Sequence, residues 1–439
     1  KSGISMVDES TCWKPFNKVN SQGRLDIVRG EGVYLYDSNG QQYIDAYSGL
    51  WNMHYGYSDQ DIKNAIIEQM NILPYANPIT INYHQNEELS TLLCTITHDE
   101  ISKIIYTCTG SESIEAAIKI SRKYSALKDK EKHLIAVMPN SYHGSYYGAM
   151  SASGYENSFK EGYGPMLDGF VTLPLPFCRC CKSGNVSDSC LKEMLDTLYK
   201  ELDSIKDKLC GVLIEPVIAS GGVMELPKEY LLALSQFCKN EDILLICDEV
   251  ATGFGRTGSM FCFQKYNIKP DIITLSKGIN NGYLPLGAVC VTKKIVREFI
   301  DKDTLLFHLS TQNGNPICIA AAIANIKKML SENITERVNI LSSLFKEMLL
   351  KELDGLNNIH DIRISGLMIA IDIVNPDTNK PISQEELSGV QQKIYMSGCI
   401  AGCSYVEGIT SSVLILPPFI LKKNEVKKIV RIMYQSLMI

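Results

Sequence analysis

The sequence has no apolar run approaching the roughly 20 residues that a helix needs to cross a bilayer, so we expect no membrane-embedded segment. It also has no excess of positive charge. Its formal net charge of −6 argues against general binding to nucleic acids or to anionic membranes. The first residues, from Lys1 to Ser5, lack the apolar core of a signal peptide. With 45% hydrophobic and 21% charged residues, and no internal repeat, the composition predicts a soluble globular protein.

The sequence contains 15 cysteines, an odd number. Most of them lie in apolar, strand-like or helical stretches, which is typical of reduced, buried thiols and predicts a cytoplasmic protein. One cluster differs, and its members are Cys178, Cys180, Cys181 and Cys190. Four neighbouring thiols could bind zinc, but their spacing fits no standard zinc motif well. Inert or redox-labile thiols are the alternative, and from the sequence we assign no metal to this cluster.

Apolar segments alternate with helical segments from about residue 85 onward. The predicted strands are residues 103–108, 133–138, 211–216, 243–248, 271–276 and 287–292. Near-continuous apolar strands separated by helices predict an α/β fold, in which a mainly parallel sheet is covered by helices on both faces. Ligands of such sheets bind at the carboxyl ends of the strands, so the residues that follow each strand are the candidates for function.

The two ends of the chain depart from this alternation. The start predicts an irregular arm over residues 1–30 and then a hairpin around the turn Asn39-Gly40. After about residue 315, long helices and two strand candidates predict an α+β segment, and we expect the hairpin to pack with it. The expected parts are residues 1–75 as the N-terminal arm and hairpin of a small domain, residues 76–315 as the large domain, and residues 316–439 as the C-terminal part of the small domain.

Three strand ends carry charged side chains. Lys277 follows the strand at 271–276 and precedes a glycine-rich turn, which suits an amine nucleophile presented into a cleft. An ordinary exposed loop lysine is the alternative for any single lysine. Asp248 ends another strand, where a buried carboxylate requires a cation or a hydrogen-bond donor. Glu215 ends a third strand and raises the same question, with a structural salt bridge as its alternative.

Two further strand ends carry candidates for ligand binding. Gly110 and Ser111 open a helix whose free N–H groups and dipole suit a phosphate, although an ordinary helix cap explains the same residues. Tyr142 and His143 follow the strand at 133–138, where the aromatic ring could stack on a planar ligand or simply pack. A phosphate cradle, a stacking ring, a carboxylate and a lysine together form the set that pyridoxal phosphate requires.

The sequence resembles the class III aminotransferases, the ω- or amine-type group of pyridoxal-phosphate enzymes of fold type I. The matching stretches are Ser48-Gly49-Leu50-Trp51, Thr109-Gly110-Ser111-Glu112, Tyr142-His143-Gly144, residues 248–258 and Leu275-Ser276-Lys277-Gly278. The resemblance implies a seven-stranded type of sheet in the large domain and a smaller α+β domain from both chain ends. It also implies transamination between an amine donor and a carbonyl acceptor (2-oxo acid, aldehyde or ketone). A racemase, aminomutase or decarboxylase reaction on the same fold is the alternative, followed by a non-catalytic subunit that binds pyridoxal phosphate.

The resemblance further implies a role for each matching residue. Lys277 is expected to form the internal aldimine with the cofactor and to shuttle protons, and Asp248 to pair with the pyridine nitrogen. The other residues expected around the cofactor are Gly110 and Ser111 at the phosphate, Tyr142 and Val250 on the two ring faces, and His143 and Glu215 beside it.

Two remaining matches concern the subunit interface and the substrate. Thr311 corresponds to a threonine that family members lend to the neighbouring subunit's phosphate, which implies a homodimer with active sites at its interface. Many members also carry an arginine shortly before the C-terminal Pro-Pro that clamps the substrate carboxylate, whereas residues 402–412 contain none. We therefore expect either an amine without an α-carboxylate or another cation, such as Arg256, with Trp51 near the substrate.

Overall fold

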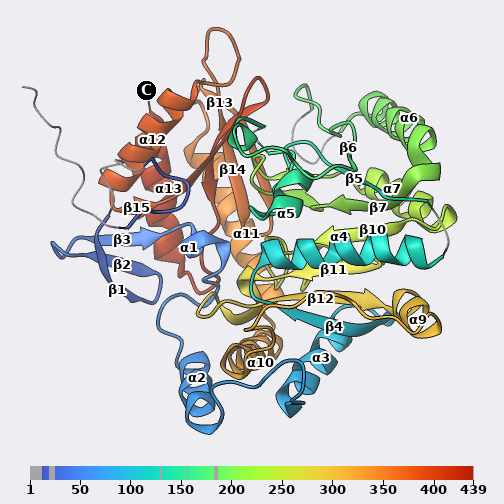
Figure 1. Cartoon of the computed structure of the whole chain (residues 1–439). Helices are drawn as coiled ribbons and strands as arrows, with labels where there is room; N and C mark the ends of the chain where they lie inside the picture. Colours follow the sequence, from blue (N-terminus) through green and yellow to red (C-terminus); the bar gives the residue numbers. More distant parts are fainter. Residues whose placement is uncertain (1–11, 19–24, 129–130, 156, 182–185, 439) are drawn as a thin grey trace, which may run out of the picture.

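The computed structural model describes residues 12–18, 25–128, 131–155, 157–181 and 186–438. At its centre lies a seven-stranded sheet with the strand order β4-β12-β11-β10-β7-β5-β6 (Figure 1). Its strands are β4 (Ile101–Thr107), β5 (Leu134–Val137), β6 (Phe170–Thr172), β7 (Leu209–Ile214), β10 (Leu244–Asp248), β11 (Ile272–Leu275) and β12 (Gly287–Thr292). β12 runs antiparallel to both of its neighbours, whereas the strands from β11 to β6 pair in parallel. The predicted α/β fold with a mainly parallel sheet is confirmed.

Alternate residues of the central strands face two separate apolar layers. In β10, Leu244 and Ile246 pack in the layer that contains α4 (Gly110–Leu127), and Leu245 and Cys247 pack in the opposite layer. This alternation follows from the period of two in a strand, and each such buried side chain contributes roughly 1.5–3 kcal/mol to folding.

The helices around the sheet are α3 (His84–Ile96), α5 (Tyr147–Ala152), α6 (Asp188–Ile205), α7 (Lys228–Asn240), α8 (Cys262–Lys265) and α9 (Lys293–Asp301), with 3-10 turns at Asn157–Lys160, Lys206–Lys208 and η3 (Lys277–Asn280).

A second, antiparallel sheet lies in the C-terminal part of the chain, with the order β13-β14-β17-β16. Its strands are β13 (Ile359–Ser365), β14 (Met368–Ile373), β16 (Gly402–Val406) and β17 (Thr410–Ile415). A short ribbon, β8 (Val217–Ile218) and β9 (Met224–Glu225), follows β7. The accompanying helices are α10 (Pro316–Ser331), α11 (Ile334–Glu352), α12 (Gln384–Met396) and α13 (Lys423–Leu437). The helices α11 and α13 pack against each other, and α12 packs on the sheet (Figure 1).

The N-terminal strands are joined to the C-terminal part of the chain by a shared sheet. The predicted hairpin forms β2 (Tyr34–Asp37) and β3 (Gln42–Asp45), and β3 pairs in parallel with β15 (Cys399–Ile400). The predicted irregular arm is wrong at β1 (Ile27–Glu31), which pairs with β2 because its backbone completes the edge of this sheet. The rest of that arm includes residues 1–11 and 19–24, which lie outside the described residues. The division of the chain at residues 75 and 315 stays a prediction.

The segment from α1 (Ser48–Trp51) to α2 (Gln60–Ile72) connects the N-terminal sheet to the large sheet. Gly49 and Leu50 have non-helical backbone angles within α1, in keeping with the glycine-punctuated sequence of this stretch. Within the described part of the chain, no helix combines the length and the apolar character that crossing a bilayer requires.

Candidate active site

The residues predicted to carry function gather at one edge of the large sheet. β4, β5, β7, β10 and β11 run in the same direction, so their carboxyl ends lie along one edge. The residues that follow these ends are Gly110 after β4, Tyr142 and His143 after β5, Glu215 after β7, Asp248 at the end of β10 and Lys277 after β11. Contacts between these side chains define the site.

Lys277 lies where the chain leaves β11 and enters η3. Its φ angle is +34°, a left-handed value that costs a residue with a Cβ on the order of 1–3 kcal/mol and that clusters at functional sites. Its Nζ lies 4.9 Å from the centroid of the Trp51 ring. Burial lowers the pKa of the Lys277 amine, while the negative charges of Asp248 and Glu215 act in the opposite direction. A lowered pKa increases the neutral fraction of the amine, which is the form that attacks a carbonyl or accepts a proton.

Asp248 is buried, with 4% of its surface exposed. Its Oδ2 lies 2.7 Å from Nδ1 of His143, and its Oδ1 accepts hydrogen bonds from the N–H of Val250 (3.0 Å) and the hydroxyl of Thr274 (3.3 Å). A carboxylate offers about four acceptor positions, so these three contacts leave room for one further donor. Nε2 of His143 is buried and has no hydrogen-bond partner among the described residues. The arrangement can therefore hold an additional polar ligand group.

Glu215 connects two of the strand ends. Its Oε1 accepts a hydrogen bond from the N–H of Tyr142 (2.7 Å), and its Oε2 accepts one from the N–H of Ala219 (3.2 Å). Burial raises the pKa of Glu215 to about 7, and Asp248 adds to this effect while His143 opposes it. Glu215 thus positions the backbone of Tyr142, whose ring is half-buried. The predicted contacts of Glu215 and Tyr142 with a cofactor stay predictions.

The start of α4 combines a helix cap with free backbone donors. Thr109 is the N-cap residue, and its hydroxyl accepts a hydrogen bond from the N–H of Glu112 (3.1 Å). The N–H groups of Gly110 and Ser111 precede that position, and the first N–H groups of an α-helix have no partner within the helix. The cap and the anion site, which the sequence left as alternatives, are therefore compatible.

Glycine is required on both sides of this helix start. A Cβ at Gly110 would lie 2.9 Å from Cγ1 of Val250, so the Val250 side chain approaches the helix start closely. A Cβ at Gly144, whose φ is +130°, would collide with the hydroxyl of Ser111. These two contacts bring Gly110, Ser111 and Val250 close together, and their predicted contacts with a phosphate-bearing cofactor stay predictions.

Thr311 lies on an exposed loop that is fixed by Glu112. The Oε1 of Glu112 accepts hydrogen bonds from Ser310 (2.7 Å) and Asn313 (3.0 Å), and its Oε2 accepts one from the N–H of Cys108 (2.7 Å). Burial acts to raise the pKa of Glu112, but the hydrogen bonds outweigh burial and lower this pKa to about 2. The loop is therefore held by an ionised carboxylate, and the hydroxyl-bearing Thr311 stays at the surface.

Arg256 is fully buried, and its terminal nitrogens already have partners within the chain. Nη1 donates to the carbonyls of Pro417 (2.7 Å) and Leu367 (3.3 Å), and Nη2 lies 3.4 Å from the hydroxyl of Ser48. The guanidinium also lies over the ring of Phe419, 4.6 Å from its centroid. These contacts explain the arginine as a link between chain segments, and its predicted contact with substrate stays a prediction. Trp51, in contrast, contacts the lysine directly.

These residues fit pyridoxal phosphate on observations of this structure. Free N–H groups at the start of α4 suit the phosphate, and the remaining acceptor position of Asp248 suits the N–H of a pyridine ring. Lys277 supplies an amine of lowered pKa. The phosphate, the ring nitrogen and the aldehyde of the ligand thus each have a complementary group along this edge of the sheet.

Glu249 follows Asp248 directly in the sequence, but the two side chains lie on opposite faces of the sheet. The sequence interpretation missed this difference. Its Oε1 accepts from the N–H of Phe263 (2.8 Å), and its Oε2 accepts from the N–H of Cys262 (3.0 Å) and the hydroxyl of Thr252 (2.5 Å). The two N–H groups belong to the first turn of α8, so Glu249 stabilises that turn. The alternation of side chains along a strand was the available signal, because it places residues 248 and 249 on opposite faces.

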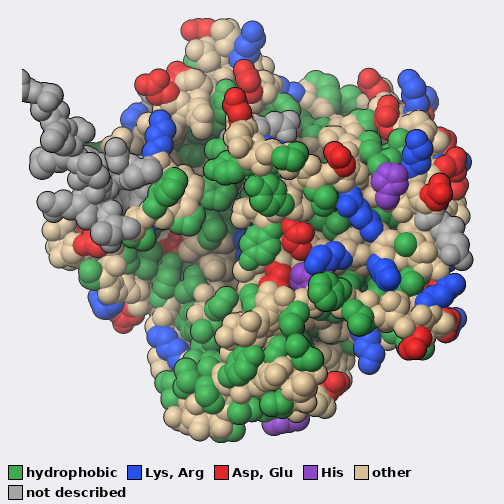
Figure 2. Space-filling view, viewed as in Figure 1, with side chains coloured by type: hydrophobic (Ala, Val, Ile, Leu, Met, Phe, Trp, Pro, Cys, Tyr) green, Lys and Arg blue, Asp and Glu red, His purple; other side chains and the backbone are tan. Residues whose placement is uncertain are grey.

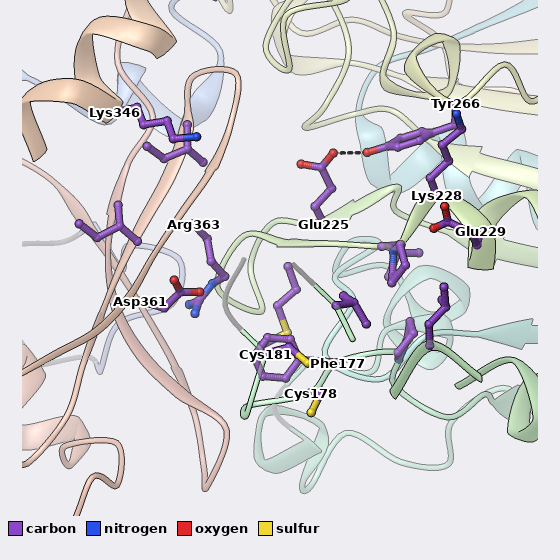
Figure 3. Close-up of a pocket in the computed structure, with 18 of the residues that line it drawn as sticks. Phe177, Cys178, Cys181, Glu225, Lys228, Glu229, Tyr266, Lys346, Asp361 and Arg363 are labelled. Carbon is purple, nitrogen blue, oxygen red and sulfur yellow. Dashed lines mark hydrogen bonds between the residues drawn. The ribbon is translucent and has the colours of Figure 1, made fainter. Parts of the chain in front are cut away.

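A separate cavity of about 680 Å³ lies between the segment that follows β6, the junction of β9 and α7, and β13 of the C-terminal sheet (Figure 3). Cys178 and Cys181 line it together with Glu225, Tyr266 and Arg363. None of the predicted site residues lines this cavity. It is therefore distinct from the site at Lys277.

Comparison with known proteins also supports pyridoxal phosphate as the cofactor of this protein. The sequence profile described as "Aminotransferase class-III" matches residues 16–437. The chain is 30% identical to an adenosylmethionine-8-amino-7-oxononanoate aminotransferase of Methanocaldococcus jannaschii, over 100% of this chain and 98% of that protein. It is 32% identical to an acetylornithine aminotransferase of Aquifex aeolicus, over 95% and 99% of the two chains. The crystal structure of a PLP-bound amine transaminase from an uncultivated Pseudomonas species matches with a TM-score of 0.91 and 25% identity, over 98% and 99% of the chains.

The environment of Glu249 predicts a pH-dependent stability. Burial raises the pKa of Glu249 to about 7, above its value of 4.5 in an unfolded chain. The folded state therefore keeps a proton that the unfolded state releases, and the free energy of unfolding falls as the pH rises through this range. The full effect is about 3 kcal/mol, from roughly 1.4 kcal/mol for each unit of pKa difference. Chemical denaturation from about pH 5 to about pH 8 should show a flatter profile for Glu249→Gln than for the wild type.

The exposed Glu407 provides the matched control for this measurement. Glu407→Gln should keep the wild-type pH profile. Only the slopes are compared, because Glu249→Gln also loses an acceptor for α8 and is less stable at every pH. Equal slopes for the wild type and Glu249→Gln would contradict the assignment.

Proposed function

The chain belongs to the class-III aminotransferases and is a pyridoxal-phosphate-dependent aminotransferase, and we propose that Lys277 is its catalytic lysine. The observation that carries this proposal is the environment of the Lys277 amine, which is desolvated, contacts Trp51 and lies within the electrostatic influence of Asp248 and Glu215. Among the predicted site residues, it is the lysine at the carboxyl edge of the sheet. The reaction is the transfer of an amino group from an amine donor to a carbonyl acceptor.

Each residue of the site has a task in this reaction. When bound, pyridoxal phosphate supplies an electron sink for the electron pair left on the substrate carbon after a proton is removed. Lys277 Nζ removes that proton and returns it at another atom, for which its lowered pKa is suited. Asp248, oriented by His143 and Val250, accepts a hydrogen bond from the ring nitrogen and keeps it protonated. Gly110 and Ser111 bind the phosphate through their N–H groups.

We propose that the amine donor carries no carboxylate on its reacting carbon. The stretch of residues 402–412 contains no arginine. The two buried arginines of the described residues also have partners within the chain: Nη1 of Arg256 donates to two carbonyl groups, and Arg363 contacts Asp372 (3.3 Å) and the hydroxyls of Thr410 (2.9 Å) and Ser412 (2.8 Å). A bidentate carboxylate contact needs a guanidinium whose donors are available. An amine without a carboxylate on its reacting carbon can bind in the site without such a contact.

We also propose that the enzyme is a homodimer in which Thr311 binds the phosphate in the neighbouring subunit. Large apolar side chains are exposed in α2, in the segment that follows it and in the segment that precedes Thr311, and they are Ile67, Met70, Ile72, Tyr75, Ile79, Ile81, Leu305, Phe307 and Leu309. Tyr75 is linked to the Thr311 loop by a hydrogen bond from its hydroxyl to the carbonyl of Thr311 (3.1 Å). Hydrophobic side chains also cover the lower part of the molecule, over α2 and α3 (Figure 2). Apolar patches of this kind mark interaction surfaces, and a second copy places Thr311 beside another site.

We also propose that the enzyme is located in the cytoplasm, which is a reducing compartment. All of the cysteines are outside disulfide bonds, and several of them are fully buried in the core. Reduced thiols of this kind are typical of cytoplasmic proteins.

Replacement of Lys277 tests the catalytic assignment. We expect Lys277→Ala to fold normally but to lose turnover by at least about 10³-fold, since it removes both the nucleophile and the general base. The absorption spectrum of the bound cofactor should change as well, because its covalent partner is gone. Lys269→Ala, a substitution of an exposed lysine, is the control and should match the wild type in both measurements. Turnover and a spectrum of wild-type character in Lys277→Ala would reject the role of this residue.

The donor proposal is tested with two amines that differ only by the α-carboxylate. Pentylamine and norleucine (2-aminohexanoic acid) share the same butyl chain on the reacting carbon. We expect pentylamine to change the absorbance of the enzyme-bound cofactor at least about tenfold faster at equal subsaturating concentration, because an unpaired carboxylate costs more than 1.4 kcal/mol when buried. A faster reaction with norleucine would mean that a cation recognises the carboxylate, and Arg256→Met would then identify whether it is Arg256.

Complementation between two inactive variants tests the shared site. In a heterodimer of Lys277→Ala and Thr311→Glu chains, one site carries both substitutions and the other carries neither, if Thr311 acts on the neighbouring subunit. We expect co-expression with two affinity tags to yield heterodimers with about half of the wild-type turnover, since one of the two sites of a closed dimer is intact. If Thr311 acts within its own chain, each site carries one substitution and the heterodimer stays inactive. A monomer in light scattering would contradict the proposed dimer directly.

A further inference from the structure

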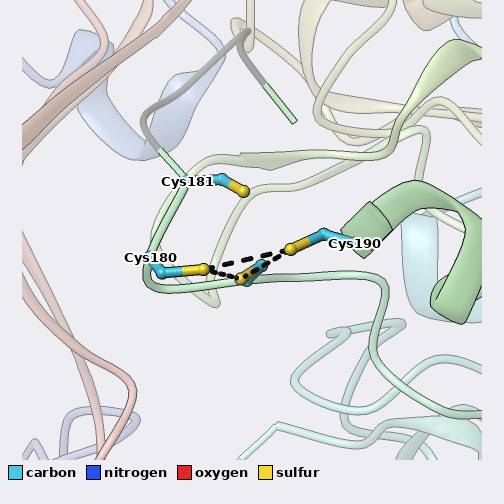
Figure 4. A group of neighbouring side chains, drawn as sticks. Cys180, Cys181 and Cys190 are labelled. Carbon is cyan, nitrogen blue, oxygen red and sulfur yellow. Dashed lines mark hydrogen bonds between the residues drawn. The ribbon is translucent and has the colours of Figure 1, made fainter. Parts of the chain in front are cut away.

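Four cysteines far from Lys277 form a compact cluster. Cys178, Cys180 and Cys181 lie in the segment between β6 and α6, and Cys190 lies in the first turn of α6. The four Sγ atoms all lie within 4.8 Å of one another. In Figure 4 the thiols of Cys180 and Cys190 point towards each other, one from the loop and one from the helix, and Cys181 lies beside them. The reaction at Lys277 uses none of these side chains.

Two of the sulfur–sulfur distances within this cluster match those around a single tetrahedral metal ion. A zinc ion at about 2.3 Å from each of four thiolates separates the sulfur atoms by about 3.8 Å. The Sγ atoms of Cys178 and Cys190 are 3.6 Å apart, and those of Cys180 and Cys190 are 3.9 Å apart. Cys178 and Cys180 lie closer, at 2.7 Å, which is still longer than the roughly 2.05 Å of a disulfide bond. A cluster with two irons needs its thiolates in two separated pairs, so the arrangement favours a mononuclear site.

The fold prepares the position of the fourth thiol. Ser187 is the N-cap of α6, and its hydroxyl accepts a hydrogen bond from the N–H of Cys190 (3.2 Å). Cys190 is thereby held in the first turn of α6, at a fixed position beside the other three thiols. A rigid ligand from a helix combined with ligands from a tight loop is the arrangement by which small zinc sites hold irregular chain segments.

The cluster lies beside contacts that reach the C-terminal sheet. Arg179, between two of the cysteines, lies 3.6 Å from Asp372 of β14, and its carbonyl lies 3.2 Å from Nε2 of His360 of β13. Asp372 also binds Arg363, whose Nε donates to the carbonyl of Gly222 in the loop between β8 and β9 (2.8 Å). The positive charge of Arg179 also offsets part of the negative charge of a tetrathiolate site. A metal ion bound by the cysteines would thus hold the backbone of Arg179 in the position from which its side chain contacts the C-terminal sheet.

We propose that Cys178, Cys180, Cys181 and Cys190 bind one structural Zn²⁺ ion, which fastens the segment between β6 and α6 to the C-terminal sheet. Binding releases the thiol protons and forms four Zn–S bonds, with no change of oxidation state. From the sequence alone no metal was assigned, because the spacing of these cysteines matches no standard motif. In the folded chain the four thiols lie close together, which their spacing in the sequence does not indicate.

Metal analysis of the intact enzyme tests this site. Protein purified without chelator from zinc-supplemented medium should contain about one zinc per chain, and Cys190→Ser should lose it. Cys94→Ser replaces a half-buried cysteine outside the cluster and should retain the metal. Cobalt in place of zinc should give the intense visible absorption of a tetrahedral tetrathiolate site in the wild type and in Cys94→Ser only. Loss of zinc should also lower the melting temperature of the wild type after chelation.

A second measurement covers the case in which Cys190→Ser fails to fold. Titration of the wild type with an organomercurial should release zinc in step with modification of four thiols, as followed with a metallochromic dye. Three results would overturn the proposal: no bound zinc with all four thiols freely reactive, a Cys178–Cys180 disulfide in mass spectra of the non-reduced protein, or iron as the bound metal. Zinc retained in Lys277→Ala keeps this test independent of the assignment of the catalytic lysine.

Discussion

The burial of the Asp248 carboxylate at the end of a central strand is the constraint on which the rest of the site depends. A buried charge is stable only when donors from the surroundings meet it. Here the donors come from three parts of the chain: His143 after β5, Val250 after β10 itself, and Thr274 on β11. Satisfying one carboxylate therefore fixes the relative position of neighbouring strand ends. The Lys277 amine is held at the same edge, where its charge is disfavoured by burial and favoured by the acids.

The central sheet was predictable because its strands are short apolar runs bounded by turns. β7, β10, β11 and β12 are buried along their whole length, so nearly every residue in them is apolar. β6 was missed because it has only three residues at the edge of the sheet, where burial does not impose an apolar pattern. β1 was missed for a related reason, since its exposed residues carry no alternation. Once a parallel sheet was predicted, the site residues could be sought at its strand ends, because ligands of such sheets bind at the carboxyl ends of the strands.

Other features depend on proximity in space, which the order of residues does not encode. Asp248 and Glu249 are adjacent acids, yet one contacts His143 and the other caps α8. Arg256 is predicted as a cation for the substrate, and its Nη1 also donates to carbonyls from two distant segments, which the sequence does not indicate. The charge of each side chain is visible in the sequence. Whether that charge is already paired depends on contacts in the folded chain, which for Asp248 and Arg256 join residues more than a hundred positions apart.

The parallel pairing of β3 with β15 has a consequence for synthesis of the chain. β3 is complete when Asp45 has been made, but its partner strand begins at Cys399, about 350 residues later in the chain. At about 5–20 residues per second, the ribosome takes roughly 20–70 s to supply that partner. Throughout this interval, the β1–β2–β3 meander exposes an unpaired backbone edge, a template for pairing with other nascent chains. A chaperone that shields this edge during translation would protect β3 until β15 is available for pairing.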